Sequence, residues 1–222
     1  MRVMLIGRGR MGRLIESLCP EVGFEVAAVV GRDGDPRAWP AADVAIDFTE
    51  AAAVVPNLER CASRGMNVVI GTTGWQQSEP AARDVAARAG IGVVAAPNFA
   101  IGVHLFAALV ERAGELLAGR PEFGAWIHEL HHAAKRDAPS GTAVQFEAAL
   151  RRGGLDRPVD VASTRAGSIP GTHTIGFDAA GETITLTHAA RDRTPFARGA
   201  LEAARWVHGR RGWFTMGDVV SR

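Results

Sequence analysis

The stretch Glu129–Thr142 gathers the residues of this chain that could move protons and bind anions. It contains His131 and His132 and then Lys135, the single lysine among 222 residues. The other 24 of the 25 basic residues are arginine. Arginine stays charged at any workable pH, whereas a lysine ammonium can be tuned to release a proton, so one retained lysine beside two histidines indicates acid–base chemistry. Chance retention of a surface lysine is the alternative.

A Pro-Ser-Gly-Thr turn closes this stretch just before an apolar helical pattern. Ser140 is expected to cap the helix, and the N–H groups of Gly141 and Thr142 in its first turn could bind an anion. A helix cap that binds nothing is the alternative interpretation.

The residues His128–His132 read H-E-x-x-H, the spacing found in zinc proteases. That motif needs a helix to bring its two histidines together. A strand is predicted here over Glu122–His131, and residues four apart in a strand lie roughly 13 Å from each other. We therefore expect no metal at these histidines.

Near the start of the chain, Gly7–Gly12 match G-x-G-x-x-G between a predicted strand and a predicted helix. Glycines there permit a tight turn and a close approach of the backbone, and the helix N-terminus favours a pyrophosphate. This context favours a dinucleotide site over a glycine-rich turn that binds nothing. The expected cofactor-binding residues are Gly7, Gly9, Arg10, Met11 and Gly12.

The end of the second predicted strand bears on the choice of dinucleotide. NAD sites often carry an acidic residue there to hold the ribose hydroxyls, while a nearby arginine suits a 2′-phosphate. Here Gly31 is uncharged, Arg32 follows and Asp33 comes next. These residues modestly favour NADPH and leave NADH open. An exposed Arg32 that takes no part in binding is nearly as good an interpretation.

Two further turns follow the fourth and fifth predicted strands. The carboxyl ends of strands are where ligands bind in open α/β sheets, although small polar residues, glycine and proline are also what ordinary turns use. Their position makes cofactor contacts expected at Gly71, Thr72 and Thr73, and at Ala96, Pro97, Asn98 and Phe99.

Short apolar runs alternate with helical patterns in the first half of the chain. Runs of this kind indicate a Rossmann-type parallel sheet flanked by helices, hence an α/β fold. Residues 31–42 are predicted to form a loop, and helices are predicted near 11–19, 51–63 and 78–89. The strand candidates are Arg2–Ile6, Glu25–Val30, Val44–Phe48, Asn67–Ile70 and Gly92–Ala95.

After Asn98 the pattern changes, because several strands follow one another with few helices between them. Such a series indicates a second, α+β domain with a mixed or antiparallel sheet. Residues 1–98, completed by 193–222, are expected to form the dinucleotide-binding domain, and 99–192 the substrate-binding and oligomerisation domain. The predicted elements are helices at Val103–Leu117, Thr142–Arg152 and 195–208, and strands at Glu122–His131, 159–165, 172–178 and 182–189.

Composition excludes several classes of protein. Hydrophobic residues make up 47% and charged residues 22%, with a net charge of +1, which is ordinary for a soluble globular domain. The arginines are scattered and form no basic stripe for nucleic acid. Cys19 and Cys61 indicate reduced thiols in a cytoplasmic protein. No signal peptide is expected, and Pro, Gly and His interrupt the uncharged residues 91–110, so no membrane span is expected either.

Together these motifs resemble the 4-hydroxy-tetrahydrodipicolinate reductase (dihydrodipicolinate reductase) family of lysine biosynthesis. The resemblance spans nearly the whole chain and is most specific in the block Glu129–Ala143. It also rests on Gly9–Gly12, Asp47–Thr49, Gly71–Gly74, Asn98–Phe99, Arg165–Gly167 and Pro170–Thr174.

The resemblance implies a cytoplasmic enzyme, usually a homotetramer, that reduces a cyclic dicarboxylate to tetrahydrodipicolinate with NADPH or NADH. It implies that His131 is a proton donor and acceptor and that Lys135 donates a proton. His132, Ser140, Gly141 and Thr142 would hold substrate carboxylate, and Arg32 would lie at the ribose end of the nucleotide. The chain departs from many relatives in a shorter glycine loop, in a shorter overall length and in the absence of an acidic residue at Gly31.

Three alternatives stay open from the residues. Another nicotinamide-dependent oxidoreductase would keep the first domain and use the Glu129–Ala143 block as a generic anion site. A non-catalytic dinucleotide sensor would bind cofactor without turnover, but it gives no reason to keep Lys135. A zinc hydrolase would need the histidines to share a metal ion.

Replacing Lys135 by Arg tests the lone lysine. Arg keeps the positive charge but cannot donate a proton at working pH, so we expect kcat to fall by about 10²-fold or more with fold and cofactor affinity unchanged. His131→Ala should cause a similar loss. Steady-state kinetics decide the matter, and near-normal turnover in the Lys135→Arg enzyme would make the lysine an accident of composition.

Overall fold

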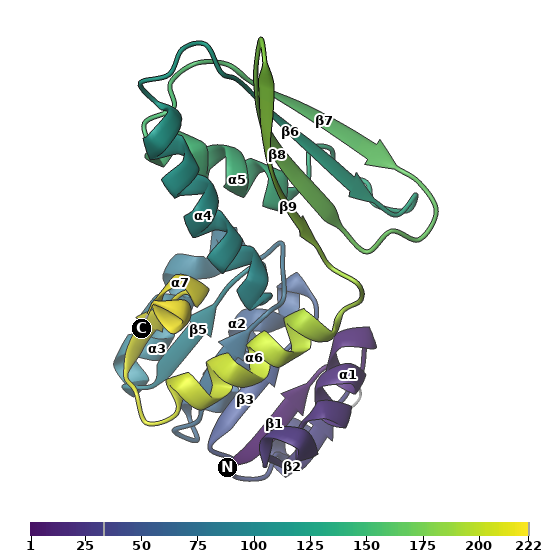
Figure 1. The fold of residues 1–222 in the computed structure, drawn as a ribbon. Coiled ribbons are helices and arrows are strands. Elements are labelled where there is room, and N and C mark those ends of the chain that lie inside the picture. Colours follow the sequence, from purple (N-terminus) through teal and green to yellow (C-terminus); the bar gives the residue numbers. More distant parts are fainter. Residues whose placement is uncertain (33, 222) are drawn as a thin grey trace. The chain divides into compact units, whose positions relative to one another are not determined.

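The computed structural model describes residues 1–32 and 34–221 of the chain (Figure 1). Contacts divide the chain into two compact units. The first unit comprises Met1–Ile101 and Thr194–Arg222, and the second comprises Gly102–Arg193.

The first unit is built on a six-stranded sheet in which every pair of neighbouring strands is parallel. Its central strands are buried runs of Val, Ile and Ala, as expected of a sheet covered on both faces. The strand order is β10-β5-β4-β3-β1-β2, with bounds β1 Arg2–Ile6, β2 Glu25–Val30, β3 Val44–Asp47, β4 Asn67–Ile70, β5 Gly92–Ala95 and β10 Gly212–Phe214.

Helices cover both faces of this sheet (Figure 1). On one face α1 (Arg10–Leu18), α6 (Thr194–Val207) and α7 (Met216–Val220) bury a core that includes Leu5 and Val94. The opposite face packs against α2 (Val54–Ala62) and α3 (Glu79–Ala89). The predicted Rossmann-type α/β architecture is therefore confirmed.

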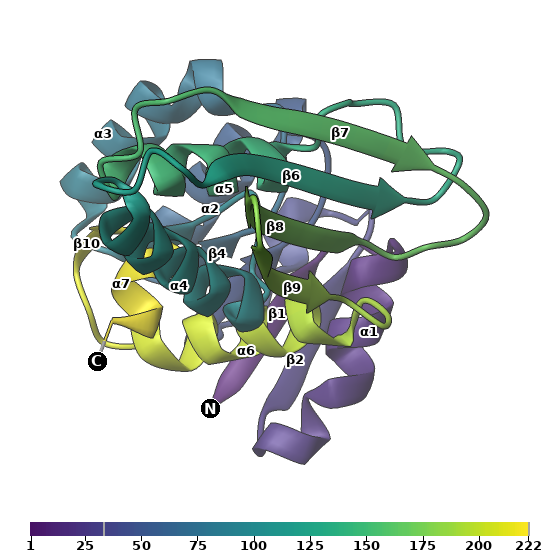
Figure 2. The same cartoon turned by 45° about the horizontal axis from the view of Figure 1, so that its top comes forward.

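The second unit holds a four-stranded mixed sheet in the order β7-β6-β8-β9. β6 pairs with β7 in parallel, while the β6–β8 and β8–β9 pairs are antiparallel, so the predicted mixed sheet is confirmed. Helix α5 lies behind this sheet in Figure 2, and Phe106 and Phe146 pack edge to face at 5.1 Å between their ring centroids. The bounds are α4 Ile101–Leu117, β6 Gly124–His131, α5 Gly141–Arg152, β7 Val159–Arg165, β8 Thr172–Ala179 and β9 Glu182–Ala189.

Several predicted boundaries differ from the structure. β3 ends at Asp47 rather than Phe48, and β6 begins at Gly124 rather than Glu122. Within the predicted loop 31–42, Pro36–Ala38 form one turn of 3₁₀ helix. Strand β10 and helix α7 were not predicted, because elements of three and five residues are too short to show a hydrophobic period. No helix in the described residues is long and apolar enough to cross a membrane.

Asn67 at the start of β4 fastens the C-terminal segment to the first unit. Its side chain is buried, and its amide nitrogen donates to the carbonyl oxygens of Val207 at 2.5 Å and Arg210 at 3.2 Å. Its amide oxygen accepts from the backbone N–H of Gly92 at 3.0 Å. One side chain thus connects β4, β5 and the turn that leads to β10.

Replacing Asn67 by Ala should lower the free energy of unfolding by about 2–4 kcal/mol, because it leaves a buried N–H and two carbonyl groups without their partner. Urea denaturation monitored by circular dichroism measures the change. Gln77→Ala, at an exposed position, is the matched control and should change stability by less than about 0.5 kcal/mol. Equal effects of the two substitutions would contradict this role.

Candidate active site

Strand β6 alternates buried and half-buried residues, and this period puts Glu129 and His131 on the same, covered face of the sheet. His128 points to the other face, where its Nε2 lies 2.9 Å from Thr164 Oγ1, and His132 follows the end of the strand. The H-E-x-x-H residues are therefore not helical, and His128 and His132 do not share the helix face that a zinc protease motif requires.

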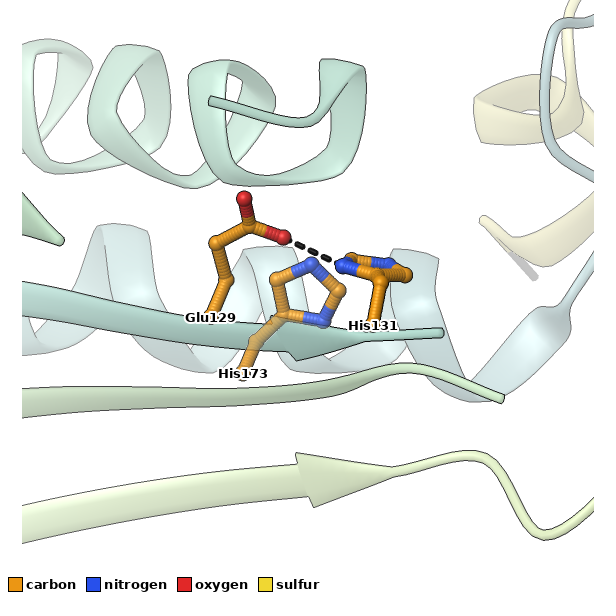
Figure 3. Close-up of side chains that lie close together, drawn as sticks. All are labelled: Glu129, His131 and His173. Carbon is orange, nitrogen blue, oxygen red and sulfur yellow. Dashed lines mark ion pairs between the residues drawn. The ribbon is translucent and has the colours of Figure 1, made fainter. Parts of the chain in front are cut away.

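Glu129 is a carboxylate with no solvent exposure. Its Oε1 accepts from Arg165 Nη2 at 2.6 Å, from Ser163 Oγ at 2.6 Å and from the backbone N–H of Ser140 at 3.2 Å. Its Oε2 contacts Nδ1 of His131 (Figure 3). Burial would raise the pKa of Glu129, but the bonds from Arg165 and Ser163 and the charge of His131 hold that pKa at about 2. The carboxylate is therefore ionised.

The imidazole of His131 lies between this carboxylate and a second histidine. The ring of His173 packs edge to face against it with centroids 5.1 Å apart (Figure 3). Burial lowers the pKa of His131, while the charge of Glu129 raises it and the charge of Lys135 lowers it. Burial also lowers the pKa of His173 to about 4, so this neighbour is uncharged at neutral pH.

Glu129, His131 and His173 each offer a possible metal-ligand atom within 4.8 Å of the others. Their contacts do not suit a cation. Glu129 Oε2 and His131 Nδ1 are in direct contact, and three donors, including the guanidinium of Arg165, already occupy Oε1. The three donors on Oε1 and the direct contact between Oε2 and Nδ1 suit a carboxylate–imidazole pair rather than a metal centre.

The loop after β6 carries Lys135. Its Nζ forms an ion pair with Asp137 Oδ1 at 2.8 Å, and its side chain is 24% exposed. The hydrogen bond from Lys135 lowers the pKa of Asp137. Arg165 Nη2, which binds Glu129, also donates to the carbonyl oxygen of Asp137 at 2.6 Å. The buried carboxylate and the loop that holds the lone lysine therefore share one arginine.

Ser140 caps helix α5, as predicted, by accepting from the backbone N–H of Ala143 at 3.2 Å. Its hydroxyl also lies 3.2 Å from His173 Nε2, and the residue is buried. The polar atoms of Ser140 thus serve internal contacts. Gly141 follows at the first position of the helix, exposed and with open space where a side chain would be.

In the first unit the turn between β1 and α1 has the close contacts expected of a dinucleotide loop. Gly7 has a φ of 110°, and a Cβ on it would lie 2.3 Å from the carbonyl oxygen of Phe48. A Cβ on Gly12 would lie 1.9 Å from the carbonyl oxygen of Gly7. Gly9 instead faces open space at the N-terminus of α1, where a phosphate group would find free N–H groups.

A cavity of about 650 Å³ adjoins this turn at the carboxyl ends of β1, β2 and β3. This volume lies within the range of small-molecule pockets, and the glycine loop forms one wall of the cavity. Predicted residues in its lining are Gly7, Gly9 and Arg32, and the lining also includes Arg8, Gly31, Trp39 and Arg60. Asp33, which was considered with Arg32, lies outside the described residues.

The remaining predicted cofactor residues lie in neighbouring turns of the first unit. Thr73 and Pro97 are exposed, whereas the side chains of Thr72 and Phe99 are buried. Thr72 Oγ1 donates to Asp47 at 3.0 Å. Gly71, Ala96 and Asn98 lie in the same turns as these residues, and Arg10 and Met11 open α1.

Comparisons with known proteins agree with this arrangement. Residues 1–99 match the family model of "Dihydrodipicolinate reductase, N-terminus", and residues 102–220 match that of "Dihydrodipicolinate reductase, C-terminus". The chain belongs to the dihydrodipicolinate reductase family. The resemblance stated from the motifs is confirmed, and with it membership of a family of oxidoreductases of the diaminopimelate and lysine pathway.

Relatives named 4-hydroxy-tetrahydrodipicolinate reductase include one from Acidiphilium cryptum, 43% identical over 96% of this chain and 94% of its own length. Another, from Stenotrophomonas maltophilia, is 44% identical over 95% of this chain and 93% of its own. A dipicolinate-bound dihydrodipicolinate reductase from Paenisporosarcina sp. TG-14 has the same fold, with a TM-score of 0.79 at 23% identity over 97% of each chain.

The predicted site residues did not include Glu129 itself, nor several residues that lie around it or line the cavity of the first unit. Ser163, Arg165 and His173 surround Glu129 and His131, and Arg8 lines the cavity of the first unit. The alternation along β6 could have paired Glu129 with His131. No local signal connects Glu129 with Arg165, which is 36 residues away.

Proposed function

We propose that this chain reduces 4-hydroxy-tetrahydrodipicolinate to tetrahydrodipicolinate with a reduced nicotinamide dinucleotide. One observation supports this most strongly: the second unit places the His131 imidazole beside an ionised carboxylate, and hydrogen bonds and ion pairs link this pair to the lone lysine and to the start of α5. A dicarboxylate needs cationic or N–H donors, and reduction of its ring needs a proton, so the network offers both.

In this proposal His131 and Lys135 supply and accept protons at the substrate. The imidazole of His132 and the N–H groups of Gly141 and Thr142 bind carboxylate. Ser140 contributes through the first turn of α5, because its own polar atoms are engaged with Ala143, His173 and Glu129.

The first unit would hold the dinucleotide, which supplies a hydride when bound. Gly9 and the N-terminus of α1 offer N–H groups to the pyrophosphate, and the turns after β4 and β5 border the same sheet edge. The proposed contacts are Gly7, Gly9, Arg10, Met11, Gly12, Gly71, Thr72, Thr73, Ala96, Pro97, Asn98 and Phe99, with Arg32 at the ribose end.

A modest preference for NADPH over NADH follows from the charges around the cavity. Gly31 offers no carboxylate to the ribose hydroxyls, and the side chain of Arg8 lies over it, with Cδ 3.3 Å from where a Cβ would be. Arg32 is exposed and can swing toward a 2′-phosphate. Arg32 also forms an ion pair with Glu50 at 3.2 Å. This pair weakens the preference, because it must break before the guanidinium can bind the phosphate.

We further propose that the protein works in the cytoplasm as a homotetramer assembled through the sheet of the second unit. Strand β9 of that sheet is mostly exposed in the single chain, which leaves its surface available to another copy. The competing functions are another nicotinamide-dependent oxidoreductase of a small carboxylated substrate and a non-catalytic dinucleotide sensor.

A coupled assay tests the reaction. The product of the preceding synthase reaction, made in place from pyruvate and aspartate semialdehyde, is mixed with the protein and NADPH, and nicotinamide absorbance is followed. We expect the absorbance to fall only when all components are present. A panel of other small keto and imino acids is the control, and faster oxidation with one of them would favour the first alternative, while oxidation with none would favour the sensor.

Replacing Arg32 by Ala should raise KM for NADPH by about 10-fold or more and leave KM for NADH nearly unchanged, because only NADPH carries the phosphate that the guanidinium would bind. Initial rates with each nucleotide give the two values. Arg37→Ala, another exposed arginine of the same loop, is the matched control. Equal effects of Arg32→Ala on both nucleotides would show that Arg32 does not contact the phosphate.

A further inference from the structure

In the contact between Glu129 and His131, one group must be the donor and the other the acceptor. The carboxylate of Glu129 is ionised and can only accept, so the hydrogen of this contact belongs to Nδ1 of His131. Nδ1 is fully buried. A neutral His131 therefore has its lone pair on Nε2, and a protonated His131 donates from Nε2.

The environment of Nε2 fits this assignment. Gly171, just before β8, lies beside it, and a Cβ there would come within 3.1 Å of Nε2. A glycine thus leaves room at the nitrogen that would exchange protons.

We propose that Glu129 is a positioning residue that fixes His131 in the Nδ1–H form and so presents Nε2 to the substrate. This inference rests on the proposed reductase function for its catalytic consequence, but the tautomer itself does not. The other oxygen of Glu129, Oε1, is occupied by Arg165, Ser163 and the N–H of Ser140. Only Oε2 is therefore left to face the histidine.

The charged and titratable groups around His131 come from four segments. Glu129 on β6 favours the imidazolium, whereas Arg165 on β7 and Lys135 in the loop oppose it. His173 on β8 is neutral at working pH. Glu129 is thus the carboxylate that offsets two cations, and its loss should lower the pKa of His131.

Glu129→Gln tests the proposal because the amide would present a donor, in place of an acceptor, to Nδ1 of His131. Three donors surround the position of Oε1, so the amide oxygen should settle there and its NH₂ group should face Nδ1. Nδ1 must then accept, which selects the Nε2–H form. Glu147→Gln, a surface glutamate of α5 paired with Arg151, is the matched control.

The primary measurement is two-bond ¹⁵N–¹H correlation NMR of histidine-labelled protein without ligands at a pH where His131 is neutral. The His131 signals are assigned by their loss in His131→Ala. We expect the Nδ1–H form in the wild type and in Glu147→Gln, and the Nε2–H form in Glu129→Gln. An Nε2–H form in the wild type would overturn the proposal, and this arm needs neither activity nor a folded Glu129→Gln variant.

The second measurement is the pH dependence of turnover. In Glu129→Gln we expect kcat to fall by about 10²-fold with a smaller change in KM. Losses of this size are typical when a catalytic histidine has the wrong tautomer or loses the residue that orients it. The limb of the profile on which His131 loses its proton should move to lower pH. A switched tautomer with kcat within twofold of the wild type would overturn the positioning role, while a wild type without reductase activity would instead reject the proposed function.

Discussion

The buried charge of Glu129 is the constraint on which the rest of the second unit's site depends. An ionised carboxylate without water is costly unless it is paired and hydrogen-bonded. Arg165, Ser163, the Ser140 N–H and His131 together meet that requirement. These partners come from β7, the start of α5 and β6 itself, so satisfying one carboxylate fixes three elements with respect to each other.

The partners of Glu129 also connect it to the groups proposed to act on substrate. Arg165 joins the carboxylate to the carbonyl of Asp137, whose own side chain holds Lys135. Ser140 joins it to the first turn of α5, which carries Gly141. A charge that has no contact with solvent thus helps to hold Lys135 and the first turn of α5 in place.

A buried carboxylate also connects neighbouring turns in the first unit. Asp47 at the end of β3 is buried, which raises its pKa, while hydrogen bonds from Thr49, Asn57 and Thr72 act in the opposite direction. Thr49 N–H also donates to Thr72 Oγ1 at 2.8 Å. The turns after β3 and β4 are therefore held together at the sheet edge where the glycine loop lies.

The sequence could predict features that repeat locally and not those that depend on distant partners. The buried Val and Ile runs predicted the parallel sheet, and the glycine spacing predicted the turn after β1, because each is a short-range pattern. The parallel pairing of β6 with β7 has no such signature, and neither does the approach of Arg165 to Glu129 or of Arg8 to Gly31. Ser140 was expected at the substrate, and only the structure shows its atoms turned to Glu129 and His173.

The proposed hydride transfer is tested by following the hydrogen that the substrate gains. NADPH carrying deuterium at one or the other of the two C4 positions is oxidised by the wild-type protein in the presence of 4-hydroxy-tetrahydrodipicolinate, and the product is analysed by mass spectrometry. We expect one deuterium per product molecule from one of the two labelled forms and none from the other. Oxidation of NADPH without transfer of the label from either form would contradict the proposed hydride transfer.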